Sequence, residues 1–252
     1  RIDRASGVVS FPAGAAVAAG LRNRVMNGGF GVNQRAHASG AALAPGVYGH
    51  DRWKAGAGGC SYAFAQGNPD TTITLTSGSL LQAVENGNVE GGTYILSWAG
   101  SATARVGIGA APSGPYAASP ISVTAAAGQS ITVEFSTGAL GRVQLEPGSA
   151  ATAFERRPIG LELALCQRYY EVGKAAAVGY ASGPGDAVGS AVNFRVTKRA
   201  VPVIATVSTE VNAGAASIVN DSMSTSAFRN YANASGAGQV TTLITWAASA
   251  EL

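Results

Sequence analysis

The sequence predicts an all-β protein, with a jelly-roll β-sandwich followed by one linking helix and a C-terminal β domain. Short runs alternate between apolar and polar side chains, which is the period of a strand with one buried face. Turn-forming clusters such as 85–88 (ENGN) and 112–115 (PSGP) separate these runs. The 34 glycines suit tight turns between many short strands. Hydrophobic residues make up 46% of the chain and charged residues 12%, so the chain can bury a core.

Four segments follow from these patterns. Residues 1–22 contain one short strand, Val8–Phe11, and are too few to bury a core of their own, so we expect them to contact another subunit or a larger assembly. Residues 23–157 form the β-sandwich. Residues 158–173 form the linker helix, and residues 174–252 form the C-terminal β domain.

The sandwich segment has the clearest strand patterns. Residues 71–76 (TTITLT) alternate cleanly. Tyr94, Leu96 and Trp98 share one face of the run at 94–98, and the apolar side chains of 121–123 and of 131–135 likewise share a face. Regularly spaced short strands of this kind are typical of two sheets packed face to face.

One helix interrupts the strands. We expect it to begin at Pro158 and to end at Gly173, because Pro favours the first turn of a helix and Gly its end. Its apolar residues recur at helical spacing: Leu161, Leu165, Tyr169 and Val172.

The C-terminal domain returns to strands, and its last run, 239–248, is apolar on both faces. One face carries Val240, Thr242, Ile244 and Trp246, and the opposite face carries Leu243. A strand of this kind lies in the centre of a sheet or at a subunit contact.

Catalytic motifs are scarce. His37 and His50 lie in a Gly/Ala-rich stretch, and the GxSxG, GxGxxG and GxxxxGK[ST] patterns are absent. Glycoside hydrolysis needs two carboxylates at a defined separation, and the candidates carry no motif: Asp51, Glu85, Glu90 and Glu134. We therefore expect a protein that is not an enzyme, with a capsule depolymerase as the enzymatic alternative.

Cofactors, metals, nucleic acids and membranes are not indicated either. Cys60 and Cys166 match no metal-binding or redox spacing, so we expect two buried thiols, and a disulfide between them stays open. The net charge is +3, but the basic residues are scattered along the chain, whereas nucleic-acid binding needs them concentrated. We expect no signal peptide and no membrane-spanning helix.

Sugar binding requires fewer precisely placed groups than catalysis does. Aromatic faces stack on pyranose rings, and a few planar polar groups bind the hydroxyls. The aromatic candidates of the middle region are Tyr48, Trp53, Tyr62, Trp98 and Tyr116. We expect Trp98 in the core and Trp53 half-buried beneath an ion pair of the preceding Asp-Arg dipeptide.

The predicted glycan-binding residues are Tyr116, Gln82, Glu85, Asn86 and Arg105. Tyr116 lies in a Pro-bounded loop, where a stiff backbone lowers the cost of ordering on binding. Gln82, Glu85 and Asn86 border a Gly turn. Arg105 lies beside them if the sheet is a meander, and its guanidinium would suit an acidic capsule sugar.

Three stretches resemble one protein family. Residues 23–35 (NRVMNGGFGVNQR), with Asp51-Arg52-Trp53, resemble the opening of phage tail-fibre domains related to carbohydrate-binding modules. Residues 143–170 (VQLEPGSAATAFERRPIGLELALCQRYY) resemble the segment that closes the same domain. The C-terminal strand domain of these fibres is similar in a further set of residues: Phe194, Arg195, Lys198, Arg199, Pro202, Phe228, Arg229, Ala250, Glu251 and Leu252.

The resemblance implies a jelly roll in a particle of a phage or a gene transfer agent, released by lysis, and binding to a cell-surface glycan. It gives packing and turn-fixing roles to Asn27, Gly28, Phe30, Gln34, Arg35, Asp51, Arg52 and Trp53. One departure is that the strands between Trp98 and Gln144 look short for the family, which predicts a reduced binding face or one used for protein contacts.

Two functions are therefore expected. The first is a tail fibre or head spike that recognises capsule or lipopolysaccharide during host attachment. The alternative is a purely structural virion component that contacts only other particle proteins. We expect a homo-oligomer in either case, and a trimer for a fibre built around a threefold axis.

Overall fold

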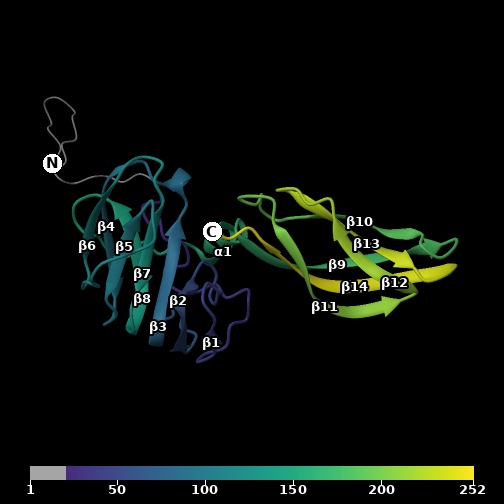
Figure 1. Ribbon diagram of the computed structural model, residues 1–252, viewed down its shortest axis with the longest axis horizontal. Helices are drawn as coiled ribbons and strands as arrows, with labels where there is room; N and C mark the ends of the chain where they lie inside the picture. Colours follow the sequence, from purple (N-terminus) through teal and green to yellow (C-terminus); the bar gives the residue numbers. More distant parts are fainter. Residues whose placement is uncertain (1–20) are drawn as a thin grey trace, which may run out of the picture.

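The computed structural model describes residues 21–252, which form two β domains joined by one short helix (Figure 1). The predicted strand Val8–Phe11 lies outside the described residues. The prediction of an all-β fold with a single linking helix is confirmed.

The first domain contains eight strands and one 3-10 turn. They are β1 (Ala42–Leu43), β2 (Lys54–Phe64), β3 (Ile73–Val84), η1 (Asn86–Asn88), β4 (Gly92–Ala99), β5 (Ala104–Ile108), β6 (Ile121–Ala125), β7 (Ile131–Phe135) and β8 (Gly138–Pro147).

These strands form a two-layer sandwich. One layer has the order β1-β2-β3-β7-β5, and the other has the order β6-β4-β8. The first residues of β8 also pair with β3, so the two layers are hydrogen-bonded at one edge. The core between the layers includes Trp53, Tyr94, Leu96, Phe135 and Leu145, all fully buried.

The helix is shorter than the sequence pattern predicts. It is α1 (Ile159–Gln167), and the chain enters strand β9 (Tyr170–Ala181) directly after it. The predicted helix end at Gly173 is wrong, because this glycine lies in β9, where a Cβ atom would collide with the ring of Trp246. The buried side chains of α1 are Cys166 and Gln167, whereas Leu161 is exposed.

The second domain contains two three-stranded sheets. One has the order β11-β14-β9, and the other has the order β10-β13-β12. The strands are β9, β10 (Ala187–Asn193), β11 (Val203–Ala213), β12 (Ala215–Asp221), β13 (Ala227–Ala234) and β14 (Gly238–Ser249). Phe228 and Trp246 meet between the sheets with ring centroids 5.2 Å apart.

Strand β14 lies in the centre of its sheet, between β9 and β11, as its two apolar faces predict. Its predicted inner residues are all buried: Val240, Thr242, Ile244 and Trp246. The outer face carries Leu243, which is only half-buried.

The end of the chain returns to the junction between the two domains, beside α1 (Figure 1). There Glu251 forms ion pairs with Arg52 and with Arg35, the latter at 2.9 Å. The guanidinium of Arg52 stacks 3.6 Å from the ring centre of Tyr169, and that of Arg35 lies at the same distance from Tyr170. The two arginines belong to the N-terminal motif, residues 23–35 and 51–53, which therefore binds the two tyrosines that follow the helix.

The remaining residues of that motif hold backbone in place. The side-chain amide of Asn27 donates to the carbonyl oxygens of Val32 and Asp51, at 2.8 and 3.0 Å. Gln34 donates to the Asp51 carboxylate at 2.9 Å and to the Tyr170 carbonyl at 2.8 Å. These contacts agree with the packing and turn-fixing roles expected for these positions.

Candidate functional site

Four side chains meet on the outer face of the first sheet, on the side turned away from the core. We call Ser79, Arg105, Tyr116 and Glu134 the outer-face cluster. Arg105 Nε donates to Glu134 Oε2 at 2.8 Å, and Ser79 Oγ donates to Glu134 Oε1 at 2.6 Å. The Arg105 guanidinium lies 4.6 Å from the centre of the Tyr116 ring. The cluster thus brings an aromatic ring, a guanidinium and a carboxylate together, with the Glu134 side chain only 7% exposed.

Strand register brings the cluster together. Arg105 on β5 lies directly opposite Glu134 on β7, and the next pair, Val106 and Val133, faces the core. Side chains alternate along a strand, so the charged pair must point outward. Tyr116 arrives from the loop after β5, which is held by a bridge between Ala104 and Ala117.

A glycine lets β2 pack closely against the cluster. Gly56 on β2 lies against Ser79, and a Cβ atom at this position would collide with the Ser79 Oγ and lie 3.3 Å from Glu134 Oε1. Since glycine has no side chain, β2 can lie close to both oxygen atoms without displacing them. Any larger residue at position 56 would push Ser79 out of its bond with Glu134.

The electrostatics of the cluster favour a charged, pre-oriented carboxylate. Burial opposes the ionisation of Glu134, but hydrogen bonds from Arg105 and Ser79 outweigh it, so the pKa of this carboxyl lies below its usual range. Burial and the neighbouring Glu134 carboxylate raise the pKa of Tyr116. Near neutral pH the carboxylate therefore accepts hydrogen bonds, and the phenol keeps its proton.

The structure joins two of the five predicted site residues and separates the other three from them. Tyr116 and Arg105 belong to the outer-face cluster, although Tyr116 is half-buried rather than fully exposed. The predicted position of Gln82 at the site is wrong. Its side chain is 1% exposed and faces the core, where it donates to the Met26 carbonyl and accepts from the Met26 N–H, both at 2.8 Å.

Glu85 and Asn86 lie at the far end of β3 from Ser79, without contact to the cluster. The Glu85 carboxylate accepts a hydrogen bond from the Tyr169 hydroxyl at 2.7 Å and pairs with Arg168 at 3.3 Å. It therefore fixes the sandwich to the residues after α1. Asn86 is exposed in η1, and its side-chain oxygen accepts the N–H of Gly87.

The other aromatic candidates serve the fold. Trp98 is in the core as predicted, and Tyr62 is fully buried. The expectation for Trp53 needs correction, because Trp53 is fully buried rather than half-buried. The expected Asp51–Arg52 ion pair is also wrong, since each of these residues pairs with a different partner.

His50 is a core residue rather than a general base. Its Nδ1 lies 3.0 Å from the hydroxyl oxygen of Tyr62, and its ring packs edge-on against Phe64, with centroids 4.6 Å apart. Burial, with a smaller contribution from His37, lowers the pKa of His50 to about 4, so the imidazole is neutral at physiological pH. Both cysteines are buried free thiols, and no disulfide joins them.

Within residues 21–252, no group of three or more His, Cys, Asp or Glu side chains is placed to hold a metal ion. The same range contains no helix that is both long and apolar enough to cross a bilayer.

Sequence reasoning missed Ser79 and weighed Glu134 only as a catalytic carboxylate. The signal for Glu134 was its place between Val133 and Phe135, because the alternation turns it away from the core. No feature of a single strand predicts that β7 lies between β3 and β5. This strand order brings Ser79, Glu134 and Arg105 together.

Comparisons with known protein families, with curated proteins and with solved structures find no match to this chain.

Proposed function

We propose that this protein is a fibre or spike component of a phage-like particle that attaches to a bacterial cell-surface glycan through the sandwich domain. The observation that supports this proposal most is the outer-face cluster, where Tyr116 offers a ring face beside the paired Arg105 and Glu134. Sugar-binding sites combine these elements, since the ring stacks on a pyranose and the planar charged groups bind its hydroxyls.

The cluster is organised before any ligand arrives. Arg105 and Glu134 hold each other on adjacent strands, and Ser79 fixes the second carboxylate oxygen. Groups that are already ordered lose little conformational entropy on binding. A rigid sheet below a short loop is a frequent arrangement for recognition.

Replacing Tyr116→Ala should weaken glycan binding by roughly 1–3 kcal/mol, the range for an aromatic anchor. The fold should persist, because Tyr116 lies on the outer face and the core residues beneath it remain. Calorimetric titration with the cell-surface polysaccharide measures the affinity, and a melting curve reports the fold.

The second domain offers a matched control. Tyr231 also lies beneath an arginine, with Arg229 4.3 Å from its ring centre, and Arg229 pairs across the strands with Asp221 at 2.6 Å. Tyr231→Ala removes the same chemistry from a different domain and should leave binding unchanged. Equal losses in the two variants, or no loss in Tyr116→Ala, would refute the assignment to the sandwich.

A second candidate function is a structural particle component that contacts only other proteins. The outer face of the sheet β11-β14-β9 favours it, because this face exposes several apolar side chains beside the polar Lys174, Thr241 and Thr245. Its apolar residues are Ala176, Val178, Tyr180, Val211, Ala213 and Leu243. Val178 is 65% exposed and Tyr180 is 80% exposed. Large apolar side chains exposed to this extent are frequent at interaction sites.

We propose that further copies of the chain cover this face, as in a homotrimeric fibre. A symmetric assembly can cover the same apolar patch on every copy. The Val178→Lys substitution should therefore shift the protein toward monomers in light scattering, whereas Val47→Lys, at an exposed valine of the sandwich, should not. A monomeric parent protein at micromolar concentration would contradict this proposal.

A further inference from the structure

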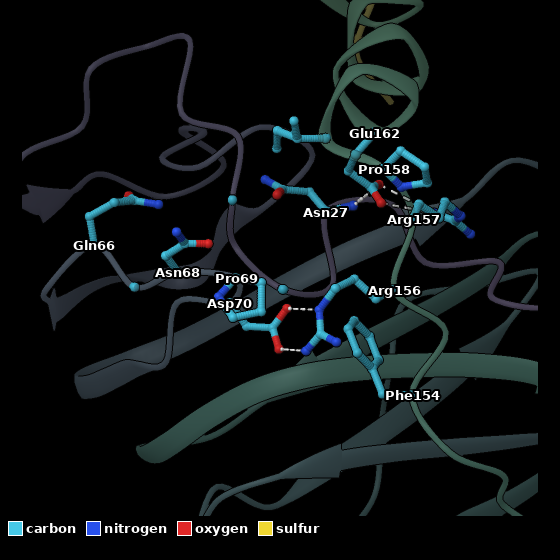
Figure 2. A pocket seen from close by; sticks show the side chains of 14 residues that line it. Asn27, Gln66, Asn68, Pro69, Asp70, Phe154, Arg156, Arg157, Pro158 and Glu162 are labelled. Atoms are coloured by element: carbon cyan, nitrogen blue, oxygen red, sulfur yellow. Dashed lines mark hydrogen bonds and ion pairs between the residues drawn. The ribbon is translucent and has the colours of Figure 1, made fainter.

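A pocket of about 430 Å³ lies where the sandwich meets the start of α1, within the range of roughly 300–1,000 Å³ that ligand sites occupy. Its walls come from the loop before β3 and from the segment that leads into the helix (Figure 2). Ser79 of the outer-face cluster lies nine residues along the chain from Asp70 of this pocket, on an extended strand, so the two places are distinct.

Two lining residues, Asp70 and Arg156, belong to a fixed charge cluster that Arg142 joins from outside the lining. The Asp70 carboxylate accepts hydrogen bonds from Arg156 Nε at 3.1 Å and from Arg142 Nε at 3.0 Å, and Arg156 adds a second bond through Nη2. These hydrogen bonds, that of Arg156 first, lower the pKa of Asp70. Two guanidinium groups face one carboxylate, so the cluster carries one net positive charge.

The other acidic residue of the pocket is also neutralised. Glu162 pairs with Arg157 at 3.2 Å and accepts the backbone N–H of Asn27 at 2.5 Å. An incoming anion therefore meets no unpaired carboxylate among the lining residues. Arg156 makes its described bonds through Nε and Nη2, so Nη1 is left for a ligand.

Two exposed amides and a ring complete the walls. Gln66 and Asn68 project from the loop before β3, and Phe154 lies beside Arg156 on the opposite side (Figure 2). No hydrogen bond within the described residues engages either side-chain amide. The loop itself is pinned, since the Gly67 N–H donates to Thr71 Oγ1 at 3.1 Å.

We infer that this pocket binds an acidic saccharide, such as a hexuronate-containing oligosaccharide. The amides bind hydroxyl groups, the Phe154 ring packs against the apolar face of the sugar, and Arg156 binds the carboxylate. A neutral sugar has no carboxylate and would lack the contact with Arg156. The inference is independent of the outer-face cluster, because no residue is shared between the two sites.

The test uses the full chain and titrates it with tetramers of galacturonate, glucuronate and mannuronate, with galactotetraose as the neutral probe. We expect one of the acidic tetramers to bind better than the neutral one. The Gln66→Ala/Asn68→Ala variant should lower that affinity at least tenfold without a change in melting temperature. Arg156→Gln should remove the preference for the acidic probe, while Asn86→Ala, at an exposed amide elsewhere on the sandwich, should change nothing.

The outcomes separate this inference from the proposed function. If the loss occurs in Gln66→Ala/Asn68→Ala and not in Tyr116→Ala, the pocket binds the acidic tetramer, and the outer-face assignment stands or falls on the titration with the host polysaccharide. If the loss occurs only in Tyr116→Ala, the pocket inference is overturned and the outer-face assignment stands. Absence of binding to all three acidic tetramers also overturns the inference.

Discussion

Replacing Trp53→Ala should lower the free energy of unfolding by roughly 3–5 kcal/mol, the range for removal of a large buried aromatic side chain. The Trp53 ring is fully buried and stacks on Phe30, with centroids 5.0 Å apart. It also meets Phe135 edge-on at 5.9 Å. Its truncation leaves a cavity between the two layers of the sandwich and removes the Nε1 hydrogen bond to the Asn27 carbonyl, at 2.9 Å.

Urea unfolding of the parent and of the variant measures this effect. Trp53→Phe is the matched control, because it keeps a ring in the cavity and loses only the hydrogen bond and part of the volume. It should cost less than half as much as the alanine variant. A Trp53→Ala protein that unfolds at the same urea concentration as the parent would show that the sandwich core is not where we place it.

Replacing Lys198→Ala should be similarly destabilising, by roughly 3–5 kcal/mol. Lys198 is fully buried and pairs with Glu171, which is also buried. The Lys198 ammonium also donates to the Gln167 carbonyl at 2.5 Å and lies 4.8 Å from the centre of the Phe194 ring. Removal of the lysine leaves a buried carboxylate without a counter-ion and frees the carbonyl at the end of α1.

An exposed pair of the same domain provides the control for this prediction. Lys174 pairs with Glu210 at 3.4 Å, but its side chain is 64% exposed. Because solvent screens such a pair, Lys174→Ala should cost only about 0–1 kcal/mol. Replacing both buried partners, as Lys198→Met/Glu171→Met, should recover part of the stability lost in Lys198→Ala. Equal costs for Lys198→Ala and Lys174→Ala would contradict the burial of the first pair.

The strands were largely predictable because alternation is a local property. The run at 239–248 illustrates this, since its inner residues occupy the core as the pattern requires. Strand β2 was harder to predict, because its sequence KAGAGGCSYAF contains few residues with strong strand preference. Its pairing with β3 establishes it as a strand, and pairing is not visible in a single segment.

The helix shows where a periodic pattern misleads. Leu161, Leu165, Tyr169 and Val172 fit helical spacing, yet the last two lie beyond the helix. The second half of this stretch pairs along its whole length with β14, so hydrogen bonding in the sheet outweighs the local helical pattern.

The candidate site was predictable in part. Tyr116 and Arg105 come together because the loop after β5 folds back and bridges to that strand at Ala104 and Ala117. The strand order β3-β7-β5, which is not a meander, adds Ser79 and Glu134 to them. The pairing of β3 with β7 sets Gln82 opposite Val133, and both side chains face the core. A one-residue difference in register decides whether a strand residue faces the ligand or the core.

The most direct test of the central claim is a structure of the protein with an oligosaccharide from the surface of its host. The account predicts a sugar ring stacked on Tyr116, with hydroxyl groups within hydrogen-bond distance of Glu134 and Arg105. An outer-face cluster that stays open to solvent in such a complex would contradict the account, whether or not the pocket beside α1 is occupied.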